Sequence, residues 1–262
     1  HHVAPMTLWE LGANVIPVGV SPNGHNINEN CGSTNPQAAA ETVVAHGADV
    51  GICLDGDADR VILLDEKGNI GNGDQFMALM AARWKAEERL KGNALVATVM
   101  SNLGLEHFLN DRGVHLERTS VGDRYVVERM RECGYNLGGE QSGHIVMTDY
   151  GTTGDGLMAG LQFLAEMIRA DKPASALMHQ FEPVPQLLEN VRFAAGQTPL
   201  EDSHVVAAIA QAEADLATGG RLLIRKSGTE PLVRVMAEHE DSALMKRAVD
   251  SVVSAVEDAV RV

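Results

Sequence analysis

The sequence predicts an α/β protein of two consecutive mixed-sheet domains followed by a small α+β domain. Short apolar runs alternate with helical patterns over about the first 180 residues, which is typical of α/β units. A proline-containing stretch then interrupts the pattern, and strands and helices follow in a different order. The predicted domains cover residues 1–70, 71–182 and 186–262.

The first segment is expected to contain two helices and then two strands. One helix covers residues 5–11, and a second begins at Pro36 and ends near Gly47, because proline suits a first helical turn and glycine a helix end. Short apolar runs over 50–54 and 61–64 predict buried strands on either side of an acidic loop.

The second segment continues the alternation. Asp74 is expected to cap a helix whose apolar face includes Phe76, Met80 and Trp84. Further strands are predicted over 95–99 and 145–148, and further helices over 103–110, 125–131 and 155–170. Because helices alternate with short apolar strands, we expect the sheets to be largely parallel.

The last segment follows a linker marked by Pro183 and Pro185. Its predicted elements are strands over 187–193, 222–225 and 232–237, a helix over 204–216 and a final helix with apolar residues from 244 to 256 on one face. A module of this size can fold around a core of its own.

Composition restricts the classes of function. The chain has 262 residues, 45% of them hydrophobic, and a formal net charge of -15, so we expect a globular protein and no nucleic-acid partner. No apolar run approaches the roughly 20 residues that span a bilayer, so no membrane partner is expected. Three cysteines without a C-x-x-C pair fit a reducing compartment, and the expected location is the cytoplasm.

An acidic loop, DGDADR at residues 55–60, follows the first predicted strand. Asp55, Asp57 and Asp59 alternate with Gly and Ala, so their carboxylates can turn toward one point, and such hard oxygen ligands suit Mg²⁺. Arg60 occupies the position at which a calcium EF-hand loop needs glycine, which excludes that motif. A solvated acidic turn and a phosphatase with an aspartate nucleophile stay open as alternatives.

A basic segment, RKSGTEP at residues 225–231, lies between two predicted strands of the last domain. Arg225, the hydroxyls of Ser227 and Thr229, the backbone around Gly228 and the nearby Arg234 together predict a phosphate-binding loop. The alternative is a basic hairpin turn whose hydroxyls are already hydrogen-bonded.

A glycine-flanked loop, GGEQSGH at residues 138–144, joins two strand-like segments. Glu140 and Ser142 can read sugar hydroxyls, whereas an isolated residue such as His144 is more often structural than catalytic. Arg124 lies at the start of a predicted helix, where anions are favoured, and Asp123 beside it is expected to be a cap.

Another glycine-rich loop covers residues 152–156. Asp155 in this loop is expected to be either the cap of the following helix or a site residue.

Together these motifs resemble those of the α-D-phosphohexomutase superfamily. DGDADR resembles its metal loop, GGEQSGH its sugar-binding loop, and RKSGTEP with Arg234 its phosphate-binding loop. Residues 22–28 with 31–33, and VGDRY at 121–125, resemble the phosphoglucosamine mutase branch.

The resemblance implies a role for each motif. Mg²⁺ would bind to Asp55, Asp57 and Asp59, with Arg60, Arg124 and His144 lining the reaction centre. Sugar hydroxyls would contact Glu140 and Ser142, and the non-reacting phosphate would be held by Arg225, Ser227, Gly228, Thr229 and Arg234. The implied reaction interconverts glucosamine-6-phosphate and glucosamine-1-phosphate through a phosphoserine enzyme and a bisphosphate.

One departure from the family pattern limits these expectations. The chain contains no loop of the T-A-S-H-N-P type, which carries the family's phosphorylated serine. We therefore expect an N-terminal domain of the same protein to be missing, the first α/β domain to be incomplete, and the chain to be inactive alone. A phosphomannomutase or phosphoglucomutase, a non-catalytic sugar-phosphate-binding protein, and a homodimeric assembly stay open.

Overall fold

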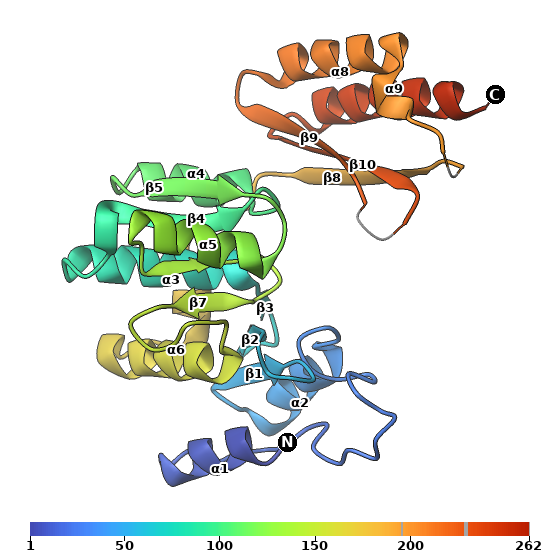
Figure 1. Cartoon of the computed structure of the whole chain (residues 1–262). Helices are drawn as coiled ribbons and strands as arrows, with labels where there is room; N and C mark the ends of the chain where they lie inside the picture. Colours follow the sequence, from blue (N-terminus) through green and yellow to red (C-terminus); the bar gives the residue numbers. More distant parts are fainter. Residues whose placement is uncertain (195, 228–229, 262) are drawn as a thin grey trace. The chain divides into compact units, whose positions relative to one another are not determined.

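The computed structural model describes residues 1–194, 196–227 and 230–261 (Figure 1). They form two compact units, the first of residues 1–101 and 105–182 and the second of residues 102–104 and 183–262. The predicted class, α/β followed by a small α+β domain, is confirmed. The predicted boundaries at residues 70 and 186 stay predictions.

Helices and short strands are interleaved up to residue 182, with some elements that were not predicted. In chain order they are α1 (Val3–Glu10), α2 (Gln37–His46), β1 (Val50–Leu54), β2 (Val61–Asp65), β3 (Ile70–Gly71), α3 (Gly73–Ala86), the short 3-10 helix η1 (Lys91–Asn93), β4 (Ala94–Thr98), α4 (Leu103–Asn110), β5 (His115–Thr119), α5 (Asp123–Cys133), β6 (Leu137–Gly139), β7 (Ile145–Met147), α6 (Gly156–Ala170) and α7 (Ala174–Met178).

The first sheet has the order β1-β2-β3, and all its strands are antiparallel. The expectation of a largely parallel sheet is wrong here, because the loop 55–60 is far shorter than the crossover of about a dozen residues that parallel neighbours need. Alternate residues face opposite sides of the sheet. Ile62 and Leu64 pack toward α2, whereas Leu63 joins the core shared with α3 and α6.

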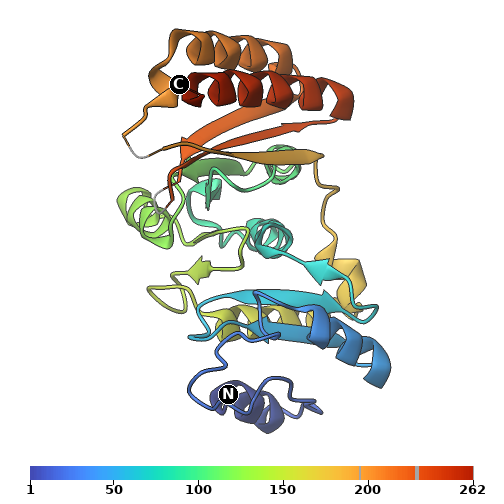
Figure 2. The ribbon, with the colours of Figure 1, turned by 90° about the vertical axis from the view of Figure 1, so that its right-hand side faces the viewer.

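The second sheet has the order β5-β4-β6-β7, with β4 parallel to β5 and β6 and only β7 antiparallel. Helices α3 and α5 cover its two faces (Figures 1 and 2). Leu95 and Ala97 pack in the core on the α3 side, while Val96 packs with Val126 and Met130 of α5. Burial on both faces explains why β4 has apolar residues on both of its sides over positions 94–97.

The second unit is an antiparallel sheet of order β8-β10-β9 with two helices on one face (Figure 1). Its elements are β8 (Gln186–Arg192), η2 (Pro199–Glu201), α8 (Ser203–Leu216), β9 (Gly220–Lys226), β10 (Leu232–His239) and α9 (Ser242–Val260). Val233, Val235 and Ala237 of β10 pack with Val249 and Val252 of α9. This core is separate from that of the first unit.

Two predicted helix caps are wrong and one is confirmed. Asn72, not Asp74, caps α3, because its Oδ1 accepts the N–H of Asp74 at 3.1 Å. Gly122 occupies the cap position of α5, so Asp123 lies inside the helix and makes no cap bond. Asp155 caps α6 by accepting the N–H of Met158 at 2.8 Å.

The strands β3 and β5 and the short helix α7 were not predicted, and β6 includes Gly138 and Gly139, which were expected to lie in a loop. Strand β3 has only two residues, and β5 has the sequence HLERT, whose polar side chains hide the apolar alternation of a strand.

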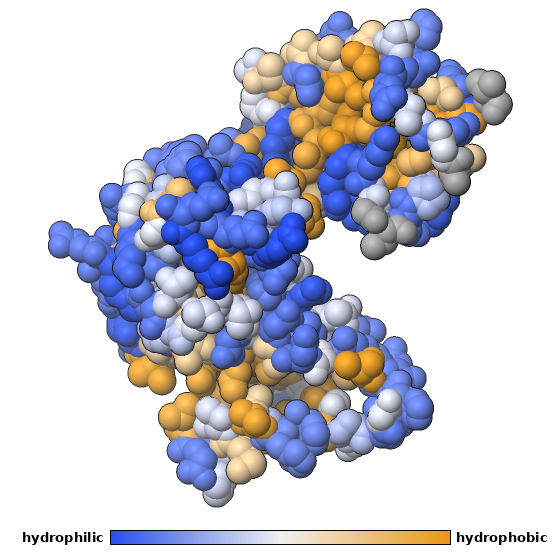
Figure 3. Space-filling view, in the orientation of Figure 1, coloured by the Kyte–Doolittle hydropathy of each residue, from blue (hydrophilic) through white to orange (hydrophobic). Residues whose placement is uncertain are grey.

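Helix α1 has no buried residue. Val3, Met6 and Trp9 are each more than three-fifths exposed, and Figure 3 shows apolar surface over this segment. Among the described residues, no helix combines the length and the apolar character that crossing a membrane requires.

Candidate functional site

The acidic turn between β1 and β2 brings the three predicted metal ligands together. Asp55, Asp57 and Asp59 each offer an oxygen atom, and these atoms all lie within 4.8 Å of one another. Ala58 adopts a left-handed conformation with φ 61°, and its N–H donates to the Asp55 carbonyl at 3.2 Å, which makes the turn compact. The N–H of Gly156 donates to the Ala58 carbonyl at 2.9 Å and ties the turn to the start of α6.

Arg60 compensates only part of the charge in this turn. Its backbone N–H donates to Asp55 Oδ1 at 3.1 Å, and its Nε lies 3.9 Å from Asp55 Oδ2 and 3.8 Å from Asp59 Oδ1. Burial raises the pKa of Asp55, and the neighbouring Asp59 carboxyl raises it further, although the N–H and the charge of Arg60 oppose the increase. The turn therefore carries too little positive charge to balance its three carboxyl groups.

The donor set fits a hard divalent cation. Asp59 Oδ1 is buried without a hydrogen-bond partner in the part of the chain that the structure describes. Arg60 Nε, at 3.8 Å, is too distant to donate a hydrogen bond to it. A buried carboxylate oxygen without a hydrogen bond is unfavourable unless a closer cation or donor reaches it. Three convergent carboxylate oxygens are the ligands that such cations prefer, so the turn is a candidate metal site.

The predicted sugar-binding loop lies directly beside the acidic turn. The loop reverses at residues 140–143, where the Gly143 N–H donates to the Glu140 carbonyl at 3.0 Å. Val61, the first residue of β2, donates its N–H to the Gly143 carbonyl at 3.0 Å. Gly143 has φ 93°, and a Cβ atom there would lie 2.0 Å from the Val61 carbonyl oxygen, so only glycine fits. Backbone contacts thus join two motifs that are far apart in the sequence.

His144 lies against the metal turn. Its Nδ1 is 3.0 Å from Asp59 Oδ2, and in the tautomer with the proton on Nδ1 the imidazole donates a hydrogen bond to this oxygen. The residue is 3% exposed, and a Cβ atom on Gly154 would lie 2.4 Å from its Nε2, so Gly154 leaves room for the ring. The geometry supports a role in orienting Asp59, while the predicted role at the reaction centre stays a prediction.

Glu140 and Ser142 lie together, as predicted. Ser142 Oγ donates to Glu140 Oε2 at 3.4 Å, and Glu140 Oε1 accepts the N–H of Gly122 at 3.0 Å. Gln141 Nε2 donates to Asp74 Oδ2 at 3.2 Å, which ties the loop to α3. The sequence did not predict that Gly122 and Asp74 support this loop, since each lies far from it along the chain and nothing local marks the contact.

Arg124 lies at the exposed start of α5. Its side chain is 70% exposed, its Nε is 3.7 Å from Glu128, and its guanidinium lies 4.8 Å from the centroid of the Tyr125 ring. These contacts are on its own helix, so a role for Arg124 in catalysis stays a prediction.

The predicted phosphate-binding segment lies in the second unit. Arg225 of β9 and Arg234 of β10 are directly paired across the two strands. Both Nε atoms are buried, and neither has a hydrogen-bond partner in the described ranges 1–194, 196–227 and 230–261. Burial lowers the pKa of Arg225, and the charge of Arg234 lowers it further. Two like charges directly opposite each other are unfavourable unless an anion lies between them, so this pair fits a phosphate group.

The remaining residues of this segment are partly described. The Ser227 N–H donates to the Leu232 carbonyl at 2.9 Å and extends the hairpin, and its Oγ accepts the N–H of Glu230 at 3.3 Å. The predicted site residues Gly228 and Thr229 lie outside the described residues.

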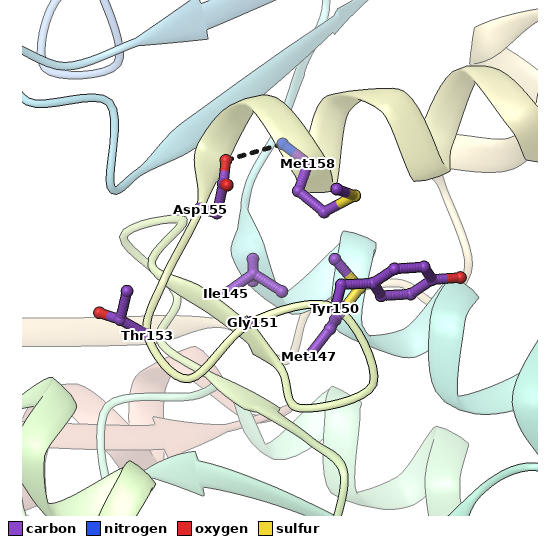
Figure 4. Close-up of a pocket in the computed structure, with 7 residues that line it drawn as sticks. All are labelled: Ile145, Met147, Tyr150, Gly151, Thr153, Asp155 and Met158. Carbon is purple, nitrogen blue, oxygen red and sulfur yellow. Dashed lines mark hydrogen bonds between the residues drawn. The ribbon is translucent and has the colours of Figure 1, made fainter.

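A small cavity beneath the loop before α6 is not a substrate site. Its volume is about 20 Å³, which is room for about one water molecule. Figure 4 shows Asp155 at its edge, bonded to the Met158 N–H as a helix cap. The lining residues are Ile145, Met147, Tyr150, Gly151, Thr153, Asp155 and Met158.

Three family models match consecutive parts of the chain. They are the phosphoglucomutase/phosphomannomutase α/β/α domain II at residues 1–68, α/β/α domain III at residues 72–184 and the C-terminal domain at residues 188–255. The matched regions contain, in turn, the acidic turn, the 138–144 loop and the paired arginines.

Two curated relatives are similar over nearly the whole of this chain. The chain is 78% identical over 260 residues to a phosphoglucosamine mutase of Roseobacter denitrificans, covering 99% of this chain and 58% of that protein. It is 72% identical over 261 residues to a phosphoglucosamine mutase of Ruegeria pomeroyi, covering 100% of this chain and 58% of that protein. The chain thus spans less than two-thirds of the length of these relatives.

A solved structure shares the fold. Aspergillus fumigatus N-acetylphosphoglucosamine mutase in complex with GlcNAc-6P and magnesium matches with a TM-score of 0.68 at 21% identity, over 89% of this chain and 54% of that chain. The three domain models and the close relatives confirm the resemblance that the motifs predicted. The chain belongs to the phosphoglucomutase/phosphomannomutase family of the phosphohexomutase superfamily.

Proposed function

We propose that the protein of which this chain forms a part is a phosphoglucosamine mutase, which interconverts glucosamine-6-phosphate and glucosamine-1-phosphate. The high identity to proteins of that name supports this substrate. One structural observation carries the proposal: the acidic turn and the 140–144 loop are joined through Val61 with Gly143 and through Asp59 with His144. A metal site and a sugar-reading loop are thereby held in one place.

Asp55, Asp57 and Asp59 would hold Mg²⁺ in this enzyme. The convergence of their oxygens supports it, as does the magnesium in the fungal mutase complex. When bound, the ion offsets the negative charge of a transferring phosphoryl group. The chain's own contribution is positional, because His144 orients Asp59 and the Arg60 N–H orients Asp55.

The sugar and its second phosphate would be bound by the other two motifs. Glu140 would accept hydrogen bonds from sugar hydroxyls, and Ser142 would donate hydrogen bonds to them. The non-reacting phosphate would be gripped by Arg225, Ser227, Gly228, Thr229 and Arg234. A phosphate site in a separate unit suits a bisphosphate that must turn over, because it can release one end of the sugar and accept the other.

A coupled assay on the full-length protein tests this function. We expect turnover of glucosamine-6-phosphate with a higher kcat/KM than that for glucose-6-phosphate or mannose-6-phosphate, and no turnover by the 262-residue chain alone. A preference for glucose or mannose phosphate would favour a phosphoglucomutase or phosphomannomutase. Net release of inorganic phosphate would instead indicate a phosphatase.

A further inference from the structure

A segment at residues 21–33 lies beside the metal turn and has no role in the site described above. Its turn is shaped by its own amide side chains. Asn23 Oδ1 accepts the N–H of His25 at 2.9 Å and of Asn26 at 3.1 Å, while Asn26 Oδ1 accepts the Asn23 N–H at 2.9 Å and its Nδ2 donates to the Ser21 carbonyl at 3.1 Å. These bonds give the exposed segment a definite shape without a core of its own.

The segment is attached to the residue that precedes the first metal ligand. The Ser33 N–H donates to the Leu54 carbonyl at 3.2 Å. Gly32 has φ 74°, and a Cβ atom there would lie 2.3 Å from the same Leu54 oxygen, so the two backbones approach as closely as only glycine allows. Leu54 is followed directly by Asp55. The segment therefore lies at the base of the metal turn.

Ile27 covers the turn itself. A Cβ atom on Gly56 would lie 2.3 Å from Ile27 Cδ1 and 2.5 Å from its Cγ1. Gly56 is not among the glycines with positive φ, so the absence of a side chain there serves this contact and not a left-handed backbone. Ile27 is 73% exposed, so burial in a core does not account for its position.

We propose that Ile27 is a positioning residue for the metal turn. By lying on Gly56 it restricts the backbone between Asp55 and Asp57, so that both carboxylates are directed to one ion before the ion binds. A contact that holds the turn in its binding geometry before the ion arrives raises affinity, because less conformational freedom is then lost on binding. The inference rests on the proposed magnesium site.

Metal binding by single and double variants tests the inference. Mn²⁺ replaces Mg²⁺ at carboxylate sites, and electron paramagnetic resonance measures its free concentration while Mg²⁺ competes. We expect Ile27→Ala and Gly56→Ala each to weaken Mn²⁺ binding about three- to tenfold. A methyl group at position 56 would displace the exposed Ile27 side chain, so both changes remove one contact. The Kd of the double variant for Mn²⁺ should therefore be no higher than the higher of the two single-variant Kd values.

Three controls separate positioning from a general loss of structure. Ile27→Val, which keeps the branched contact, should retain most of the affinity. Ile168→Ala removes the same side chain at a position on α6 that is 83% exposed, and it should leave binding unchanged. Urea unfolding of the metal-free chain should be the same for Ile27→Ala as for the wild type.

The possible failures are distinguishable. Wild-type binding that persists unchanged in Ile27→Ala and Gly56→Ala would overturn the role of Ile27 and leave the metal site standing. Effects that multiply in the double variant would also overturn it. No binding by the wild-type chain, or equal binding by Asp57→Asn, would overturn the metal site and this inference with it.

Discussion

Replacing Arg234 should weaken anion binding without lowering the stability of the free chain. Arg234 lies directly opposite Arg225 in the sheet, and both guanidinium groups have a buried Nε atom. For two charges about 6 Å apart, repulsion at an effective dielectric constant between about 20 and 80 is about 0.7 to 3 kcal/mol. Arg234→Gln removes this repulsion, so the free chain should be as stable as the wild type or more stable.

The same substitution should weaken binding of phosphate. A bidentate guanidinium–phosphate contact is worth about 2 to 3 kcal/mol, so the Kd for glucosamine-6-phosphate should rise about 30- to 150-fold. Isothermal titration calorimetry measures the Kd, and hydrogen exchange of the β10 amides measures the stability of the second unit.

A matched control lies in the same sheet. The Arg192 side chain of β8 is 72% exposed and is paired with Glu230 at 3.2 Å, so Arg192→Gln should alter the Kd less than twofold. Loss of stability in Arg234→Gln with unchanged affinity would show that the arginine is structural, and the phosphate site would be refuted.

Three further substitutions test the fold around the site. Glu238→Gln removes a fully buried carboxylate whose Oε2 lies 2.5 Å from Arg221 Nε. The free energy of opening that hydrogen exchange measures for the β10 amides should therefore fall by about 3 kcal/mol. Asp155→Ala removes the cap of α6 and should lower the free energy of unfolding of the first unit by about 1 kcal/mol in urea, followed by tryptophan fluorescence. Burial raises the pKa of Asp65, but hydrogen bonds, chiefly from Asn69, outweigh this and lower it. This stabilisation is present above the unfolded-state pKa of about 4 and is lost as pH falls through the folded-state pKa. In urea unfolding at a series of pH values, the free energy of unfolding of Asp65→Asn should therefore fall less at acid pH than that of the wild type.

Most helices and strands were predictable because their signals are local. The strand predicted over 50–54 and the helix predicted to end at Gly47 match β1 and α2. An apolar run and a glycine in the left-handed conformation at a helix end both depend only on neighbouring residues. The direction of pairing was not predictable in the same way. It follows from the length of each connection, and the short loop 55–60 forces an antiparallel pair where a parallel one was expected.

The groups that can do chemistry were recognisable from residue types and spacing alone. Three carboxylates at alternate positions of one turn can converge on one point, and the structure confirms that they do. The contacts that support them are visible only in the folded chain, where His144 lies against Asp59 and Ile27 lies against Gly56. The two residues of each pair are far apart in the chain and meet through strand register and loop path. Packing of the whole unit sets both, so no local pattern of residues encodes these contacts.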